Sequence, residues 1–195
     1  MIKDILNEIR YYQMFLNELI SDYYLNELIC DFYEQDRVKY RKYGNNLSNI
    51  SKALKYRQHM LCYLLFYEDK DSKSIPKLLN RLKDTKILED KKLDYFVKCL
   101  SDDIKDLLNS AKTDIINLKE YRHNIYAHWN KNRFKSEWQE QFKSEHIFDF
   151  EKIFNISKKC IEIFTEIICI CNENAYISSE VDKAYANLLI DTLKK

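Results

Sequence analysis

Apolar residues recur at three- and four-residue steps along most of the chain, which is the period of an amphipathic helix. Residues 2–40 show this period first, and the polar pair Ser21-Asp22 leaves open a break within that helix. A second helix is predicted from about Leu47 to Tyr67. After a charged loop, Ser74-Ile75-Pro76 predicts the start of a third helix, because proline is tolerated in a first helical turn.

The carboxyl-terminal half shows the same period. Residues 88–130 predict a helix in two pieces that divide near Asn109-Ser110, and residues 147–174 predict a long helix. Ser179 and Asp182 have the spacing of a capping box, which predicts one more helix at the end of the chain.

The rarest residues favour an all-α fold. The chain has one glycine, Gly44, and one proline, Pro76. Chains rich in β-strands need many glycines for their tight turns, whereas long helices need almost none. We therefore predict one helical bundle over residues 1–175, with residues 176–195 as an additional C-terminal helix packed on the same domain.

A single glycine also excludes several classes of enzyme. A phosphate-binding loop, a dinucleotide-binding fingerprint and a nucleophile elbow each need several glycines close together, so no nucleotide cofactor of those types is expected. The net charge is +1, from 32 basic and 31 acidic residues. Any binding of nucleic acid must therefore come from a local basic patch.

The cysteines indicate a reducing compartment. None of them forms a Cys-x-x-Cys pair, and the first ten residues are charged and amphipathic rather than a signal segment. We expect reduced, mostly buried thiols in a cytoplasmic protein. The longest apolar run, residues 161–171, is too short to cross a bilayer, so no membrane partner is expected. The six cysteines are Cys30, Cys62, Cys99, Cys160, Cys169 and Cys171.

One short run carries candidate chemistry. Two of the four histidines lie close after Arg122: His123 is the next residue, and His128 lies six residues after Arg122. Cleavage of RNA without a metal needs a base for the 2′-hydroxyl, an acid for the leaving 5′-oxygen and a cation for the phosphorane. Histidine suits the proton transfers and arginine suits the phosphate. Arg122 and His128 are therefore the candidate catalytic residues.

Helix geometry constrains how these residues meet. Asn124 and His128 lie on one face of a helix, and Arg122 is rotated from His128 by about a third of a turn. One helix would supply only one such histidine, whereas a two-fold axis would bring two Arg/His pairs together. If the protein is an enzyme, we expect its site at the seam of a homodimer.

The run from Arg122 to His128 resembles the signature of HEPN proteins, in which an arginine and often a polar residue precede a histidine by a few positions. The upstream residues 64–79, with their acidic loop and the sequence Ser-Ile-Pro-Lys-Leu-Leu, resemble the abortive-infection AbiU group of that superfamily. The resemblance covers about residues 1–175. It implies a dimeric helical bundle, metal-independent RNA cleavage that leaves a 2′,3′-cyclic phosphate, and a role as a toxin or in antiviral defence.

The resemblance also implies roles for single residues. Arg122 would bind the scissile phosphate, His128 would act as acid and base, and His123 and Asn124 would support them. Toxins of this kind that are silenced by adenylylation usually have a tyrosine two residues after the histidine, and this chain has Asn130 there. Control by a nucleotidyltransferase antitoxin is therefore in doubt.

A basic patch flanks the signature and could bind RNA phosphates. Its members are Lys119, Lys131, Arg133 and Lys135. A solvated surface is the alternative interpretation of these charges. Glu120 with His123 superficially matches the Glu-x-x-His element of di-iron bundles, but the chain has no second copy, so no metal or other cofactor is expected.

Two functions remain open from the sequence. The first is an endoribonuclease toxin, and the second is a catalytically silent HEPN scaffold that binds RNA or a partner protein in a defence complex. Retention of both Arg122 and His128 favours the first. For these two residues, the alternative to catalysis is an ordinary polar helix face packed at an interface. His59 and His146 stand alone and are predicted to be structural.

Overall fold

A computed structural model describes residues 2–35, 43–68, 73–122 and 149–171. Within these ranges the chain is helical and contains no strand, which confirms the predicted all-α fold. The described helices are α1 (Ile2–Gln35), α2 (Gly44–Phe66), α3 (Ile75–Asp84), α4 (Lys91–Ser110), α5 (Lys112–Tyr121) and α7 (Phe150–Ile170). The expected terminal helix at 176–195 and the end of the predicted 88–130 helical region, from residue 123 on, lie outside the described residues.

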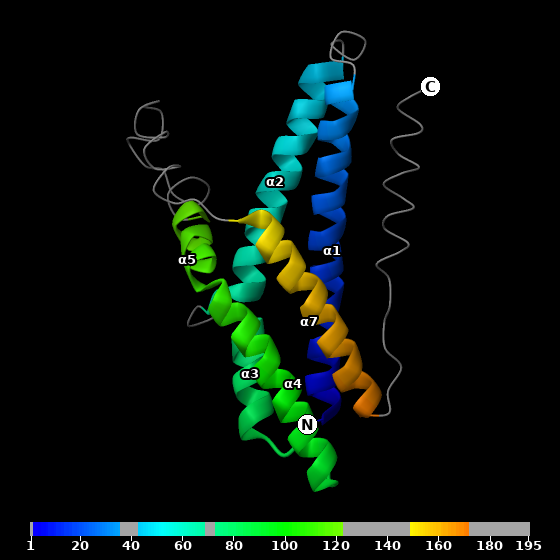
Figure 1. Ribbon diagram of the computed structural model, residues 1–195, viewed down its shortest axis with the longest axis vertical. Coiled ribbons are helices and arrows are strands. Elements are labelled where there is room, and N and C mark those ends of the chain that lie inside the picture. Colours follow the sequence, from blue (N-terminus) through cyan, green and yellow to red (C-terminus); the bar gives the residue numbers. More distant parts are fainter. Residues whose placement is uncertain (1, 36–42, 69–72, 123–148, 172–195) are drawn as a thin grey trace.

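Figure 1 shows α1 and α2 side by side along the long axis, with α7 crossing α1 obliquely. The shorter helices α3 and α4 pack together at the end of the bundle where the chain begins. Helix α5 continues from α4 and packs against α2. All six helices therefore connect through neighbouring contacts into one bundle.

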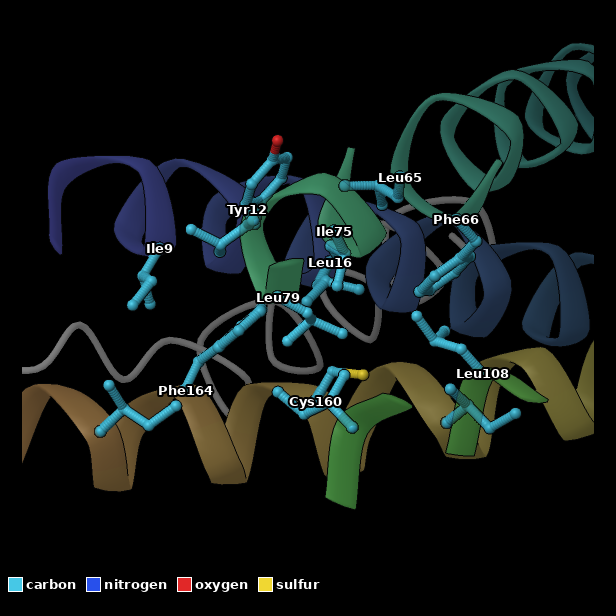
Figure 2. Close-up of a cluster of buried hydrophobic side chains, with 14 of the residues drawn as sticks. Ile9, Tyr12, Leu16, Leu65, Phe66, Ile75, Leu79, Leu108, Cys160 and Phe164 are labelled. Carbon is cyan, nitrogen blue, oxygen red and sulfur yellow. The ribbon is translucent and has the colours of Figure 1, made fainter. Parts of the chain in front are cut away.

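The core forms where the six described helices meet, and Figure 2 shows part of it. Helix α1 contributes Ile9 and Leu16, both fully buried. Both belong to a series of apolar residues that are three or four positions apart, so they form one stripe along α1. This stripe faces α3 and α7. Phe164 of α7 is also fully buried in this cluster. In this part of α1, the three- and four-residue period of the sequence thus corresponds to residues that pack in the core.

Two predicted boundaries agree with the structure, whereas α2 begins at Gly44 rather than near Leu47, and α4 and α7 each begin about three residues after the predicted positions 88 and 147. Helix α3 begins at Ile75 with Pro76 in its first turn, and the division of the 88–130 region falls at Ala111, one residue beyond Ser110. The break allowed at Ser21-Asp22 does not occur, because α1 is continuous from Ile2 to Gln35. The reason is that Arg57 on α2 pairs with Asp22, so the continuous helix accommodates this polar residue.

Asp22 is a buried carboxylate in the middle of α1, at 5% exposure. Its Oδ1 accepts a hydrogen bond of 3.2 Å from Arg57 of α2, which also pairs with Glu18. Its Oδ2 has no hydrogen-bond partner among the described residues. Burial raises the pKa of Asp22 to about 6, and the Arg57 guanidinium opposes this shift only in part.

This carboxyl makes stability depend on pH. Its pKa in the folded chain lies above the ordinary value of 3.8, so its contribution to stability is fullest below pH 4 and falls as the pH rises to about 6. We expect Asp22→Asn to unfold like the wild type near pH 4 and to be more stable by about 2–3 kcal/mol at pH 7.5. Thermal unfolding at both pH values measures this. A stability difference that is independent of pH would contradict the expectation.

The junction of α4 and α5 is held by the start of α7. The helix is interrupted at Ala111, and the exposed carbonyl of Ser110 accepts a 2.7 Å hydrogen bond from Lys152 Nζ. The same ammonium lies 3.0 Å from Asp114 Oδ2, and the other carboxylate oxygen of Asp114 accepts from the backbone N–H of Asp149. These contacts fix the direction of α5, which ends at the predicted signature.

Candidate functional site

Arg122 lies at the carboxyl end of α5 and is half-buried. Its backbone N–H donates to the carbonyls of Leu118 and Lys119, so it continues the last turn of the helix. The centre of its guanidinium lies 4.3 Å from the centroid of the Tyr63 ring on α2. This distance is within the range of a cation–π contact. The predicted phosphate-binding arginine is therefore held against a neighbouring helix.

Two tyrosines and two cations form what we call the Tyr–cation cluster: Tyr63, Tyr67, Lys119 and Arg122. Tyr63 and Tyr67 are one helical turn apart on α2, and their rings stack with centroids 5.1 Å apart and planes inclined by 16°. Lys119 Nζ lies 5.4 Å from the centroid of the Tyr67 ring, one turn before Arg122. Each cation thus faces one ring of the stacked pair.

The electrostatics of the cluster favour an anion. A hydrogen bond with Tyr67 raises the pKa of Lys119, so its ammonium is charged at neutral pH together with the guanidinium of Arg122. Stacking on an aromatic ring uses the face of a guanidinium and leaves its in-plane N–H groups for acceptors. A phosphate group is the ligand that suits two such cations.

The buried Nε atom of Arg122 affects both anion binding and packing. Its Nε is shielded from solvent and has no hydrogen-bond partner among the described residues. A guanidinium that is partly desolvated without pairing binds an incoming anion more strongly than one in water, because the local dielectric constant is lower. The same partial burial means that Arg122 also packs between α5 and α2.

The structure places two of the eight predicted site residues, Arg122 and Lys119, and brings them together. The others belong to 123–148 and lie outside the described residues; they are His123, Asn124, His128, Lys131, Arg133 and Lys135. Sequence reasoning missed Tyr63 and Tyr67. Their four-residue spacing was a usable signal, but it is equally typical of a core stripe.

His59 is the histidine of the described part of the chain, and the prediction that it is structural is confirmed. Its side chain is buried against Phe150, with ring centroids 4.8 Å apart. Its Nδ1 donates to the carbonyl of Lys55 at 2.5 Å. Burial lowers the pKa of His59 to about 4, so the ring is neutral at physiological pH. It takes no part in the cluster.

The expectation of mostly buried thiols is wrong. All six cysteines are free, but only Cys62 and Cys160 are buried, and Cys169 is exposed. For Cys169 the reason is that α7 is apolar on more than one face, whereas Cys30 on α1 and Cys99 on α4 lie at half-buried positions beside the core. Burial raises the pKa of the Cys160 thiol to about 12, which leaves it protonated and unreactive.

Within the part of the chain that the structure describes, no three His, Cys, Asp or Glu side chains are grouped to hold a metal ion. Among the same residues, no helix has a stretch long and apolar enough to span a lipid bilayer.

Comparisons with protein-family models, with curated proteins and with solved structures find no match to this chain. The likeness to HEPN proteins therefore stays a prediction that depends on residues 64–79 and 122–128 of the sequence.

Proposed function

We propose that the chain is a metal-independent endoribonuclease of the HEPN kind that acts as a cytoplasmic toxin in phage defence or in a toxin–antitoxin system. The observation that carries the proposal is the placement of Arg122. It is half-buried at the end of α5, stacked on Tyr63, and one turn from the charged Lys119. A fixed guanidinium beside a second cation is what a scissile phosphate requires.

In the proposed mechanism, Arg122 donates hydrogen bonds to the phosphate and stabilises the charge that develops on the phosphorane. The imidazole of His128 takes the proton of the 2′-hydroxyl, and a second His128 protonates the departing 5′-oxygen. Attack of the 2′-oxygen forms a 2′,3′-cyclic phosphate and breaks the bond to the 5′-oxygen. A homodimer supplies the two histidines, with His123 and Asn124 in support.

A second candidate function is favoured by the buried Nε of Arg122. A half-buried arginine placed over a tyrosine ring is also a structural contact between two helices. In that case the chain would be a silent HEPN scaffold that binds RNA, an antitoxin or another subunit of a defence complex.

A cleavage assay separates the two candidates. Purified wild-type protein is incubated with total RNA in EDTA, and the products are tested for 2′,3′-cyclic phosphate ends. We expect cleavage by the wild type and a loss of about 10²–10⁴-fold in His128→Ala, because that variant loses its acid and base. His59→Ala is not a suitable control because His59 is buried. The matched control is His146→Ala, which should retain full activity.

Two results would count against the enzyme. Wild-type protein that leaves RNA intact while binding it supports the scaffold. Equal cleavage by His128→Ala and wild type would mean that the observed activity does not arise from this residue.

A further inference from the structure

A cavity of about 280 Å³ opens beside the Tyr–cation cluster, where the end of α2, helix α3 and the α4–α5 junction meet. Tyr67 belongs to both, because it lines the cavity and also faces Lys119. The cavity is at the small end of ligand sites, which suits a single planar group rather than a large molecule. Its apolar wall is formed by Phe66, Tyr67, Leu79, Leu108, Ile115 and Ile116.

Ile116 shows that the apolar wall extends to the surface. It lines the cavity and is 45% exposed, so an apolar side chain lies at the mouth. The amides of Asn80 and Asn109 line the same cavity and can donate and accept hydrogen bonds. An apolar and aromatic wall with a few amides is the chemistry that binds a nucleobase.

A row of cations leads from the cavity to Arg122. Lys105 and Lys112 line the cavity, and both are exposed. Lys105 of α4 and Lys112 of α5 lie at this cavity on either side of the α4–α5 junction, and Lys119 follows Lys112 by nearly two turns on the same side of α5. Arg122 follows one turn after Lys119. Glu68 is the acidic residue of the cavity lining.

We infer that the cavity is a base-binding subsite for single-stranded RNA, whose phosphates follow the row of Lys105, Lys112, Lys119 and Arg122. The choice of RNA as the ligand rests on the proposed function. The row supplies charge complementary to a phosphate backbone, and the cavity lies at its side. A base held in a duplex is stacked on both faces and cannot enter such a cavity. The ligand is therefore an unpaired strand.

Binding of a strand that cannot be cleaved tests this inference. The probe is a fluorescent single-stranded oligomer with 2′-O-methyl groups throughout, compared with its duplex and with an abasic oligomer of equal length. We expect the wild-type full chain to bind the single strand at least about tenfold more tightly than either, since stacking of one base changes affinity by about this factor or more.

Two pairs of variants localise the binding. Lys105→Ala/Lys112→Ala should weaken binding of the single strand by about tenfold and reduce the slope of log K against log salt by about 1.4. Lys91→Ala/Lys92→Ala removes the same charge from exposed positions at the start of α4, and should change binding less than about twofold. Ile116→Glu should abolish the preference over the abasic oligomer. Ile50→Glu, at the same 45% exposure on α2, should retain it.

Equal binding of normal and abasic oligomers would overturn the inference, and so would equal weakening by the two lysine pairs. Because the probe has no 2′-hydroxyl, it reports binding without hydrolysis. Base-dependent binding by a protein that fails to cleave RNA would contradict the proposed function alone. Cleavage without base-dependent binding would contradict this subsite alone.

Discussion

Replacing Arg122 by alanine should lower the rate of RNA cleavage by about 10²–10³, because the variant loses the donor that stabilises the developing charge on the phosphate. Arg122→Lys should not restore the rate. A lysine presents a single point charge, whereas the guanidinium can stack on Tyr63 and donate two parallel hydrogen bonds at once. Initial rates on a fluorogenic RNA under excess substrate measure the effect.

Controls separate catalysis from folding in this experiment. Arg81 on α3 is a half-exposed arginine paired with Glu8, so Arg81→Ala removes the same group away from the cluster and should cleave at the wild-type rate. Tyr63→Phe retains the ring under Arg122 and should remain active, while Tyr63→Ala should lose activity. Wild-type rates in a folded Arg122→Ala protein would remove this residue from the mechanism.

Phe164→Ala should destabilise the chain by about 3–5 kcal/mol, which is the largest effect on stability that we expect from one substitution. Phe164 is fully buried in the cluster of Figure 2, so its removal leaves a cavity among Ile9, Leu16 and their neighbours. Domains of this size are stable by about 5–15 kcal/mol, so the variant would lose a large share of its stability.

Urea unfolding followed by circular dichroism measures this loss as a lower midpoint with an unchanged slope. Phe96 on α4 is the matched control, because it is 49% exposed and Phe96→Ala creates no cavity. We expect that variant to unfold within about 0.5 kcal/mol of the wild type. Similar losses from both substitutions would show that Phe164 does not have the central place in the core given above.

The sequence predicted those features of the fold that depend on neighbours along the chain. The start of α3 at Ile75, with Pro76 in its first turn, and the division of α4 from α5 follow from local residue preferences. The continuity of α1 at Asp22 could not be predicted, because it involves Arg57 on another helix. A contact between two helices leaves no local pattern in a single sequence from which it could be predicted.

The residues of the candidate site likewise include one that the sequence predicted and others that it did not. Arg122 was predicted from a short motif, and the structure describes its place in α5. Tyr63 became visible only when α2 and α5 were packed together, since tyrosines are common in this chain and most of them need no functional explanation. Lys112 and Lys105 beside the cavity were missed because they lie seven and fourteen residues before Lys119, outside the motif.

The hydrogen bonds of Asp114 have a consequence for the stretch between Arg122 and Asp149. That stretch leaves the end of α5, and the N–H of Asp149 at its far side bonds to Asp114 near the start of the same helix. Both of its attachment points are thus set by one ten-residue helix. The bundle therefore holds both ends of the segment that carries the proposed His123, Asn124 and His128 through the same short helix.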